Sequence, residues 1–230
     1  MSALNFDFAP WRLSGTVVGV LLNHGPALAA LGEAVHAAPY KAPPKAPVLY
    51  VKPRNTQVGE GARVVVPAGV PELEVGAALG LVIGRAACRV SAQEALAHVA
   101  GLVIVADLSV PHASFYRPAV RLKARDGFCP IGPRVWPLAA APAVDRLAVR
   151  VAVDGRPVHE SSTGERVRGA AQLLADVSAF MTLAPGDVLM TGVAAGAPRV
   201  AAGHAVDVAI EGLGALSFEL VAQAVAQEPA

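Results

Sequence analysis

The chain has 230 residues, 54% of them hydrophobic and 16% charged, and its formal net charge is +1. This length and apolar content suit one domain with a sizeable core. The near-neutral charge argues against an electrostatic nucleic-acid binder, which would carry a basic excess. Two cysteines are too few for a disulfide framework or a zinc site.

We also expect neither a membrane-spanning segment nor a secretory signal. The apolar runs, such as residues 99–106, are far shorter than the roughly 20 residues that span a bilayer. The N-terminus contains Asp7 and has no basic n-region, unlike a secretory signal. We therefore expect a soluble cytoplasmic protein that binds neither membranes nor nucleic acids.

The first half of the chain alternates short apolar runs with breakers. Four prolines predict an extended loop over residues 39–47. Ser91 and Glu94 have the spacing of a capping box, and they predict a helix over 92–99. An Ala/Leu-rich segment predicts another helix over 27–38. β-branched or continuous apolar runs predict strands over residues 16–22, 48–52, 63–66, 77–83 and 102–106.

The second half consists mainly of hairpin signals. Asp154-Gly155 separates two short runs, 148–153 and 158–161, and is typical of a tight hairpin turn. An amphipathic pattern predicts a helix over 169–180. Further strands are predicted over residues 188–191, 206–210 and 215–221.

Many short strands with few helices predict a β-dominated α+β fold. Regular alternation of strands and helices is absent, which argues against a Rossmann fold or a TIM barrel. We expect a single domain over residues 1–230, with an N-terminal segment at 1–60 and a core at 61–225.

The candidate catalytic and substrate-binding residues are concentrated in the middle of the chain. Asp107 comes at the end of a predicted buried strand. A cationic stretch follows it, made up of Arg117, Arg121, Lys123 and Arg125. A metal-binding acid followed by a cationic loop is a reasonable way to hold a small dianionic substrate.

Several segments, spread in order along the chain, carry a family likeness. They are residues 52–56, 81–84, 99–101, 107, 116–118, 121–127 and 180–192. Together they resemble the fumarylacetoacetate hydrolase family. The resemblance implies a mixed β roll or sandwich, usually dimeric, with Mg2+ or Mn2+ in a cleft.

Within the family, residues 38–45 and 126–132 look like the N-terminal half of the isomerase/decarboxylases of 4-hydroxyphenylacetate degradation. These enzymes have two homologous halves, either fused or separate. The likeness implies a subunit of the 2-hydroxyhepta-2,4-diene-1,7-dioate isomerase and 5-oxopent-3-ene-1,2,5-tricarboxylate decarboxylase system. It further implies a small di- or tricarboxylate substrate. The partner would be a second copy or a metal-bearing paralogue.

The family's metal ligands are a Glu-x-Glu pair and a later Asp, which Asp107 matches. Gly76 and Ala78 occupy the positions that correspond to the glutamates. Glu72 and Glu74 form a pair four residues too early, about 13 Å away along a strand. Either a bulge restores their register and they bind the metal, or they are turn residues and the site has no metal.

Two further family elements are altered. Related enzymes carry a His and a Glu on a lid helix after Asn23, and Ala27 and Ala30 stand there instead. His24 and Glu33 are nearby and could substitute, but their spacing differs.

The family's Thr-Gly-Thr substrate loop is Thr191-Gly192-Val193 here. Thr191, Gly192 and Asn23 therefore remain as candidate substrate-binding residues, whereas Val193 cannot donate a hydrogen bond.

The resemblance assigns Lys123 to the cleft, where it binds or polarises the substrate. The arginines at 117, 121 and 125 can bind carboxylates bidentately or form structural ion pairs with Asp126. Cys129, between Phe128 and Pro130, is more typical of a packed side chain than of a nucleophile.

Three functional hypotheses follow. In the first, the chain is an isomerase/decarboxylase subunit in which Lys123 and Asp107 are catalytic. In the second, it is a silent partner that completes an oligomer without its own chemistry. In the third, it is another hydrolase or oxo-acid decarboxylase of the family with a rearranged metal site.

Overall fold

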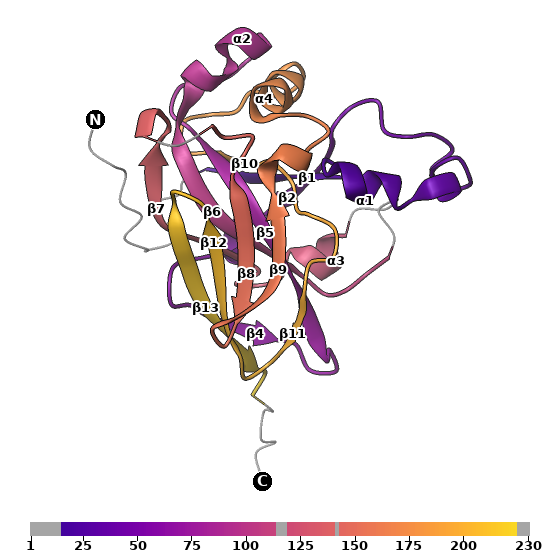
Figure 1. Ribbon diagram of the computed structural model, residues 1–230, viewed down its shortest axis with the longest axis vertical. Coiled ribbons are helices and arrows are strands. Elements are labelled where there is room, and N and C mark those ends of the chain that lie inside the picture. The colour runs from indigo at the N-terminus through magenta and orange to yellow at the C-terminus, as the bar shows by residue number, and fades with distance from the viewer. Residues whose placement is uncertain (1–14, 114–118, 141–142, 225–230) are drawn as a thin grey trace.

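The strands in the described part of the chain form two sheets that pack face to face, with short helices at their ends (Figure 1). The computed structural model describes residues 15–113, 119–140 and 143–224. Because strands dominate and the helices are few and short, the predicted β-dominated α+β fold is confirmed.

The larger sheet has the strand order β2-β1-β10-β5-β6-β7-β3, and β11 extends the same side of β5 that β10 pairs with. Its longest strands, β5 and β6, form its centre. The bounds are β1 (Val17–Leu21), β2 (Val48–Lys52), β3 (Gln57–Val58), β5 (Glu72–Ile83), β6 (Val99–Ser109), β7 (Cys129–Pro137), β10 (Val188–Met190) and β11 (Arg199–Ala201).

The smaller sheet has the order β4-β13-β12-β8-β9. Its predicted hairpin turn is confirmed, since Asp154 and Gly155 both adopt positive φ angles of 49° and 76° between β8 and β9. The bounds are β4 (Arg63–Val66), β8 (Ala148–Val153), β9 (Arg156–Ser162), β12 (Ala205–Ile210) and β13 (Gly214–Ala222).

The helices are shorter than the sequence predicts. Gly32, with φ 48°, divides the segment expected at 27–38 into α1 and a 3₁₀ turn over Gly32–Val35. The Ser91 hydroxyl donates to the Glu94 carboxylate (2.8 Å) and does not cap the backbone, so the predicted capping box does not form. The helix bounds are α1 (Gly25–Ala29), α2 (Ala92–Ala95), α3 (Val120–Lys123) and α4 (Ala170–Ser178).

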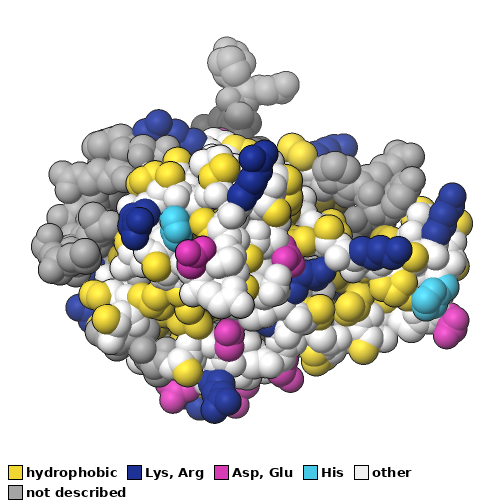
Figure 2. Space-filling model, turned by 90° about the horizontal axis from the view of Figure 1, so that it is seen from above, with side chains coloured by type: hydrophobic (Ala, Val, Ile, Leu, Met, Phe, Trp, Pro, Cys, Tyr) yellow, Lys and Arg dark blue, Asp and Glu magenta, His cyan; other side chains and the backbone are white. Residues whose placement is uncertain are grey.

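None of the helices in the described ranges is long and apolar enough to cross a membrane. On the face shown in Figure 2, acidic and basic side chains are interspersed among hydrophobic and uncharged ones. This mixed face agrees with the near-neutral charge of the sequence.

The two faces of β5 have different neighbours. Its odd-numbered residues, such as Leu79 and Leu81, pack in the main core with side chains of the smaller sheet. Its even-numbered residues, such as Ala78 and Val82, join a second cluster. Asp107 lies on this second face because it pairs with Gly76 across β5 and β6.

The position of Asp107 corrects one prediction. The sequence places it at the end of a buried strand, but β6 continues to Ser109 and encloses Asp107 within the sheet. Its carboxylate is held by Tyr50 and Lys52 of β2 and by Lys123 of α3.

Candidate functional site

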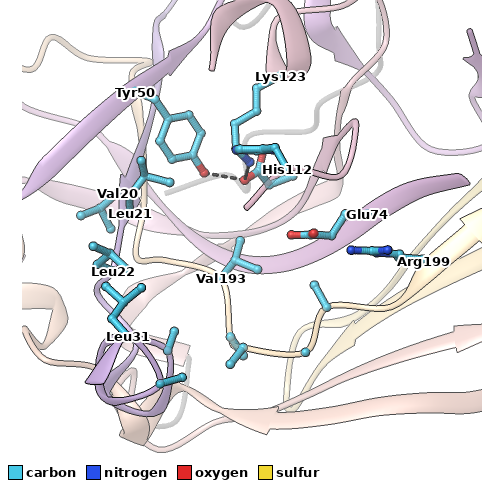
Figure 3. Close-up of a pocket in the computed structure, with 17 residues that line it drawn as sticks. Val20, Leu21, Leu22, Leu31, Tyr50, Glu74, His112, Lys123, Val193 and Arg199 are labelled. Carbon is cyan, nitrogen blue, oxygen red and sulfur yellow. Dashed lines mark hydrogen bonds and ion pairs between the residues drawn. The ribbon is translucent and has the colours of Figure 1, made fainter. Parts of the chain in front are cut away.

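One cavity of about 480 Å³ opens above the second face of β5 (Figure 3). It is bounded by the sheet on one side and by α1 and the loop after β10 on the other. Its lining includes the polar side chains of Tyr50, Glu74, Asp107, His112, Lys123 and Arg199. The remaining lining residues are apolar or glycine, including Val20, Ala27, Ala30, Leu31, Val193 and Ala194.

The carboxylate of Asp107 is the centre of the polar group. Its Oδ2 accepts hydrogen bonds from the Lys123 ammonium (2.7 Å) and from the Tyr50 hydroxyl (2.5 Å). Its Oδ1 lies 2.7 Å from Nζ of Lys52. Both Asp107 and Lys52 are almost completely buried.

Lys52 is fixed from the other side by the backbone. Its Nζ donates to the carbonyl oxygens of Leu108, Lys123 and Phe128 at 2.7, 3.0 and 2.9 Å. Three acceptors require three N–H groups, so Lys52 is an ammonium ion. Because all three protons point at carbonyls, its contact with Asp107 Oδ1 is an ion pair without a directed hydrogen bond.

These contacts determine the charge of the site. Burial would raise the pKa of Asp107, but the ammonium groups of Lys123 and Lys52 outweigh it and hold that pKa well below its usual range. Burial lowers the pKa of Lys52, and the Asp107 charge opposes the change. Two cations and one anion leave one excess positive charge, which favours an anionic ligand or intermediate.

Tyr50 is placed by a glycine. Gly19 on β1 is its cross-strand partner, and a Cβ at Gly19 would come within 2.1 Å of the Tyr50 ring. Over this ring lies the Lys123 ammonium, 4.8 Å from the centroid. Burial, followed by the charge of Asp107, raises the pKa of Tyr50 well above its usual value, so its hydroxyl stays protonated.

Comparison with known proteins gives the family. The family model for the fumarylacetoacetate (FAA) hydrolase C-terminal domain matches residues 16–221. The chain belongs to the fumarylacetoacetate hydrolase family. It is 41% identical over 209 residues to the 4-hydroxyphenylacetate degradation bifunctional isomerase/decarboxylase of Escherichia coli. That match covers 91% of this chain and 48% of the relative, so the chain spans about half the length of the curated relatives it matches.

Two solved structures have a similar fold. The 2-hydroxyhepta-2,4-diene-1,7-dioate isomerase of Mycobacterium marinum is similar, with a TM-score of 0.76 and 28% identity over 92% of this chain and 76% of that one. The 5-carboxymethyl-2-hydroxymuconate delta-isomerase of Mycobacterium smegmatis has a TM-score of 0.77 and 27% identity over 92% and 80%.

The residues present do not fit the metal centre that the family resemblance implies. A side chain at Gly76 would meet the Val193 methyl groups at 2.8 Å, and Ala78 supplies no ligand. Glu74 pairs with Ser109, two residues along β5 from the level of Asp107. Among the described residues, no group of three or more His, Cys, Asp or Glu side chains could hold a metal ion.

The two glutamates considered as metal ligands lie apart. Glu72 pairs with Ala201 on β11 and is not part of the cavity lining, whereas Glu74 faces the cavity. No bulge between Glu74 and Val82 restores the missing register, because the β5–β6 pairing is continuous over these residues. Both glutamates lie in β5, so the alternative that they are turn residues is wrong.

The wall opposite Asp107 carries methyl groups. Ala27 and Ala30, which stand where the family resemblance implies a His and a Glu, line the cavity. His24 does not replace them: its Nδ1 accepts from the backbone N–H groups of Ala27 (3.2 Å) and Ala195 (3.1 Å). Glu33 is exposed and lies outside the cavity lining.

The candidate substrate-binding residues of the first strand end and of the β10 loop lie behind the cavity. Asn23 is buried and binds backbone atoms of Arg168 and Thr191 through both ends of its amide. Thr191 donates to the Leu79 carbonyl. Neither residue, nor Gly192, belongs to the cavity lining, so they position the loop that carries Val193.

The predicted arginines are not brought to Asp107. Arg121 is exposed, and Arg125 donates from Nε to the Arg121 carbonyl (3.0 Å) beside a separate surface hollow. Asp126 accepts from Asn55 at 2.6 Å, and neither Arg121 nor Arg125 pairs with it. Arg117 lies outside the described residues.

Four polar residues of the site escape prediction from sequence: Tyr50, Lys52, His112 and Arg199. Tyr50 and Lys52 are two positions apart on a predicted strand, and this spacing places them on one face. His112 and Arg199 carry no local signal. Cys129 is buried as predicted, and burial raises the pKa of its thiol to about 12.

Proposed function

We propose that the chain isomerises a small unsaturated 2-hydroxy dioic acid of the 2-hydroxyhepta-2,4-diene-1,7-dioate type, without a metal ion. One observation carries the proposal: Lys123 and Tyr50 flank the buried Asp107 carboxylate at the base of a cavity that has one excess positive charge. The similarity to isomerases of such compounds supports this substrate class.

The reaction moves one proton. The hydroxyl proton at C2 leaves, the C2 oxygen becomes a carbonyl, both double bonds shift by one place and C5 gains a proton. The intermediate is a dienolate with its charge on the C2 oxygen. One N–H of Lys123 is held by Asp107, and no further acceptor is found among the described residues, so two N–H groups can stabilise that oxygen.

The proton carriers come from the same cavity. Glu74 and His112 are side chains of the type that can take up and release a proton, and both line the cavity (Figure 3). Tyr50 is a poorer choice because its raised pKa keeps the proton on its hydroxyl.

Isomerisation is favoured over decarboxylation by the same residues. Loss of carbon dioxide leaves an electron pair on the substrate. A metal ion held by carboxylates, as the family resemblance implies, would stabilise this charge as a Lewis acid. Here Gly76 has no side chain to bind such a metal, and Val193 fills the space that a side chain at this position would need. Proton transfer with one cationic group at the oxygen is within the chemistry of Lys123.

We further propose that the chain works with a second chain of the same fold, either a copy or a metal-bearing paralogue. Its span of about half the relatives' length supports such an arrangement. A silent-partner role is the second candidate, favoured by the methyl groups of Ala27 and Ala30 in the lid wall.

The test is turnover of 2-hydroxyhepta-2,4-diene-1,7-dioate by the purified chain, followed by loss of dienol absorbance, with added Mg2+ and with a chelator. We expect the same rate in both. Lys123→Gln should lower the rate about 100- to 1000-fold because the dienolate loses its main hydrogen-bond donor. Arg121→Gln, an exposed cation on the same short helix, should keep the rate.

No turnover by a folded sample would overturn the proposal in favour of the silent partner. A rate abolished by the chelator would contradict metal independence and require another set of ligands.

A further inference from the structure

A second cation lines the cavity away from the Lys123 group. Arg199 lies on β11, and Glu74 on β5 is its cross-strand partner. Figure 3 shows the two side chains near one another, on the opposite side of the view from Tyr50. The cavity therefore has a cationic group at each end.

Strand register sets the separation of these ends. Asp107 pairs with Gly76 and Arg199 pairs with Glu74, so the two are offset by two residues along β5 and by two strand spacings across it. These offsets are about 7 Å and about 10 Å, which places the two Cα atoms about 12 Å apart. Since antiparallel partners share a face, both side chains rise into the same cavity.

This separation suits a dioic acid. The end carbons of an extended seven-carbon chain are joined by as many bonds as two residues of backbone, so they lie about 7 Å apart. The side chains of Lys123 and Arg199 can bridge the remaining distance at either end. A shorter monoacid would engage the Lys123 end alone.

The guanidinium of Arg199 has no ion pair within the described ranges, although Glu74 is its neighbour. Other arginines differ: Arg150 and Arg168 are held by carboxylates at 2.6 and 2.8 Å. Arg199 is also exposed at the rim, where a ligand can reach it. A planar guanidinium in this position can bind a carboxylate bidentately.

We propose that Arg199 binds the distal carboxylate of the substrate and makes the site select dioic acids over monoacids. This inference rests on the proposed function, since that function places the 2-oxygen at Lys123. Glu74 then lies between the two anchors, beside the middle of the bound carbon chain.

The experiment measures equilibrium binding of heptanedioate and of heptanoate, saturated analogues that cannot react, together with turnover of the dienoic substrate. We expect the wild type to bind heptanedioate more tightly than heptanoate. Arg199→Gln should weaken heptanedioate binding about 10- to 100-fold and leave heptanoate binding unchanged, because only the dioic acid loses a charged contact. Turnover should show a raised KM with a smaller change in kcat.

Arg150→Gln is the matched control, since this exposed arginine lies on the smaller sheet, and it should leave all values unchanged. Equal affinities of the wild type for the two acids, or an unchanged heptanedioate affinity in Arg199→Gln, would overturn the inference. Arg199-dependent binding by a chain that shows no turnover would support it while overturning the proposed activity.

Discussion

The two walls of the cavity enclose the same space but differ in chemistry. The sheet wall carries Tyr50, Asp107 and Lys123, joined by short hydrogen bonds and supported by Lys52 below them. The opposite wall, from α1 and the loop after β10, presents methyl groups. The charged anchor is built on β2, β6 and the short helix α3, whereas the His and Glu that the family resemblance implies for the lid helix are absent.

The sheet wall carries the larger desolvation cost because its charged groups are buried. An ammonium and a carboxylate removed from water lose several kcal/mol of solvation each, which is recovered only when every charge is paired and hydrogen-bonded. Lys52 meets this condition with three carbonyls and the carboxylate of Asp107. The methyl wall makes no such demand, so its residues can change with less effect on stability.

The largest expected effect comes from breaking the sheet wall at its centre. Asp107→Asn keeps the shape but leaves two buried ammonium groups without a counter-charge. We expect a loss of about 3–5 kcal/mol in the free energy of unfolding, measured by urea denaturation. Glu160→Gln, which breaks the exposed pair with Arg150, should be nearly neutral. Equal effects of the two variants would mean that the buried pairs are no stronger than a surface pair.

A smaller effect should appear as a pH dependence of the same wall. The folded pKa of Asp107 lies below its unfolded value of about 3.9, so its ionised form stabilises the fold above about pH 4. That contribution is lost as pH falls from there towards the folded pKa. The stability gap between wild type and Asp107→Asn should therefore be full at about pH 6 and narrow at about pH 3. A gap that stays constant over this range would show that Asp107 is not the ion that stabilises the site.

The sequence predicts part of the sheet wall and, through Ala27, Ala30 and Val193, most of the opposite wall. The strand period and the family likeness located Asp107, Lys123 and the misplaced Glu74, and the structure brings the first two into direct contact. Their chemical roles remain predictions. The sequence does not indicate the role of Lys52, because a lysine in a strand is ordinarily exposed and its buried partners come from distant segments.

Other misses have a similar physical cause. The predicted arginines follow Asp107 closely in sequence, but α3 directs only Lys123 into the cavity, and Arg121 remains exposed. Arg199 reaches the site because β11 pairs with β5, a long-range contact without a local pattern. The helix expected over residues 27–38 is also shorter in the structure, because Gly32 interrupts a segment whose composition alone favours a helix.

The smallest expected effect concerns the point where the two walls meet. A Cβ at Gly76 would approach both Val193 methyl groups at 2.8 Å and the Asp107 carbonyl oxygen at 3.0 Å. Gly76→Ala should therefore cost about 1–3 kcal/mol in urea denaturation, as overpacking does elsewhere. In a Val193→Ala background the same change should cost less by about 1 kcal/mol, because the clashing methyl groups are gone. Purely additive costs would contradict the direct contact between these positions. Coupled costs would mean that positions 76 and 193 compete for the same space, so that a larger side chain at 76 needs a smaller residue at 193 before it can enter the cavity.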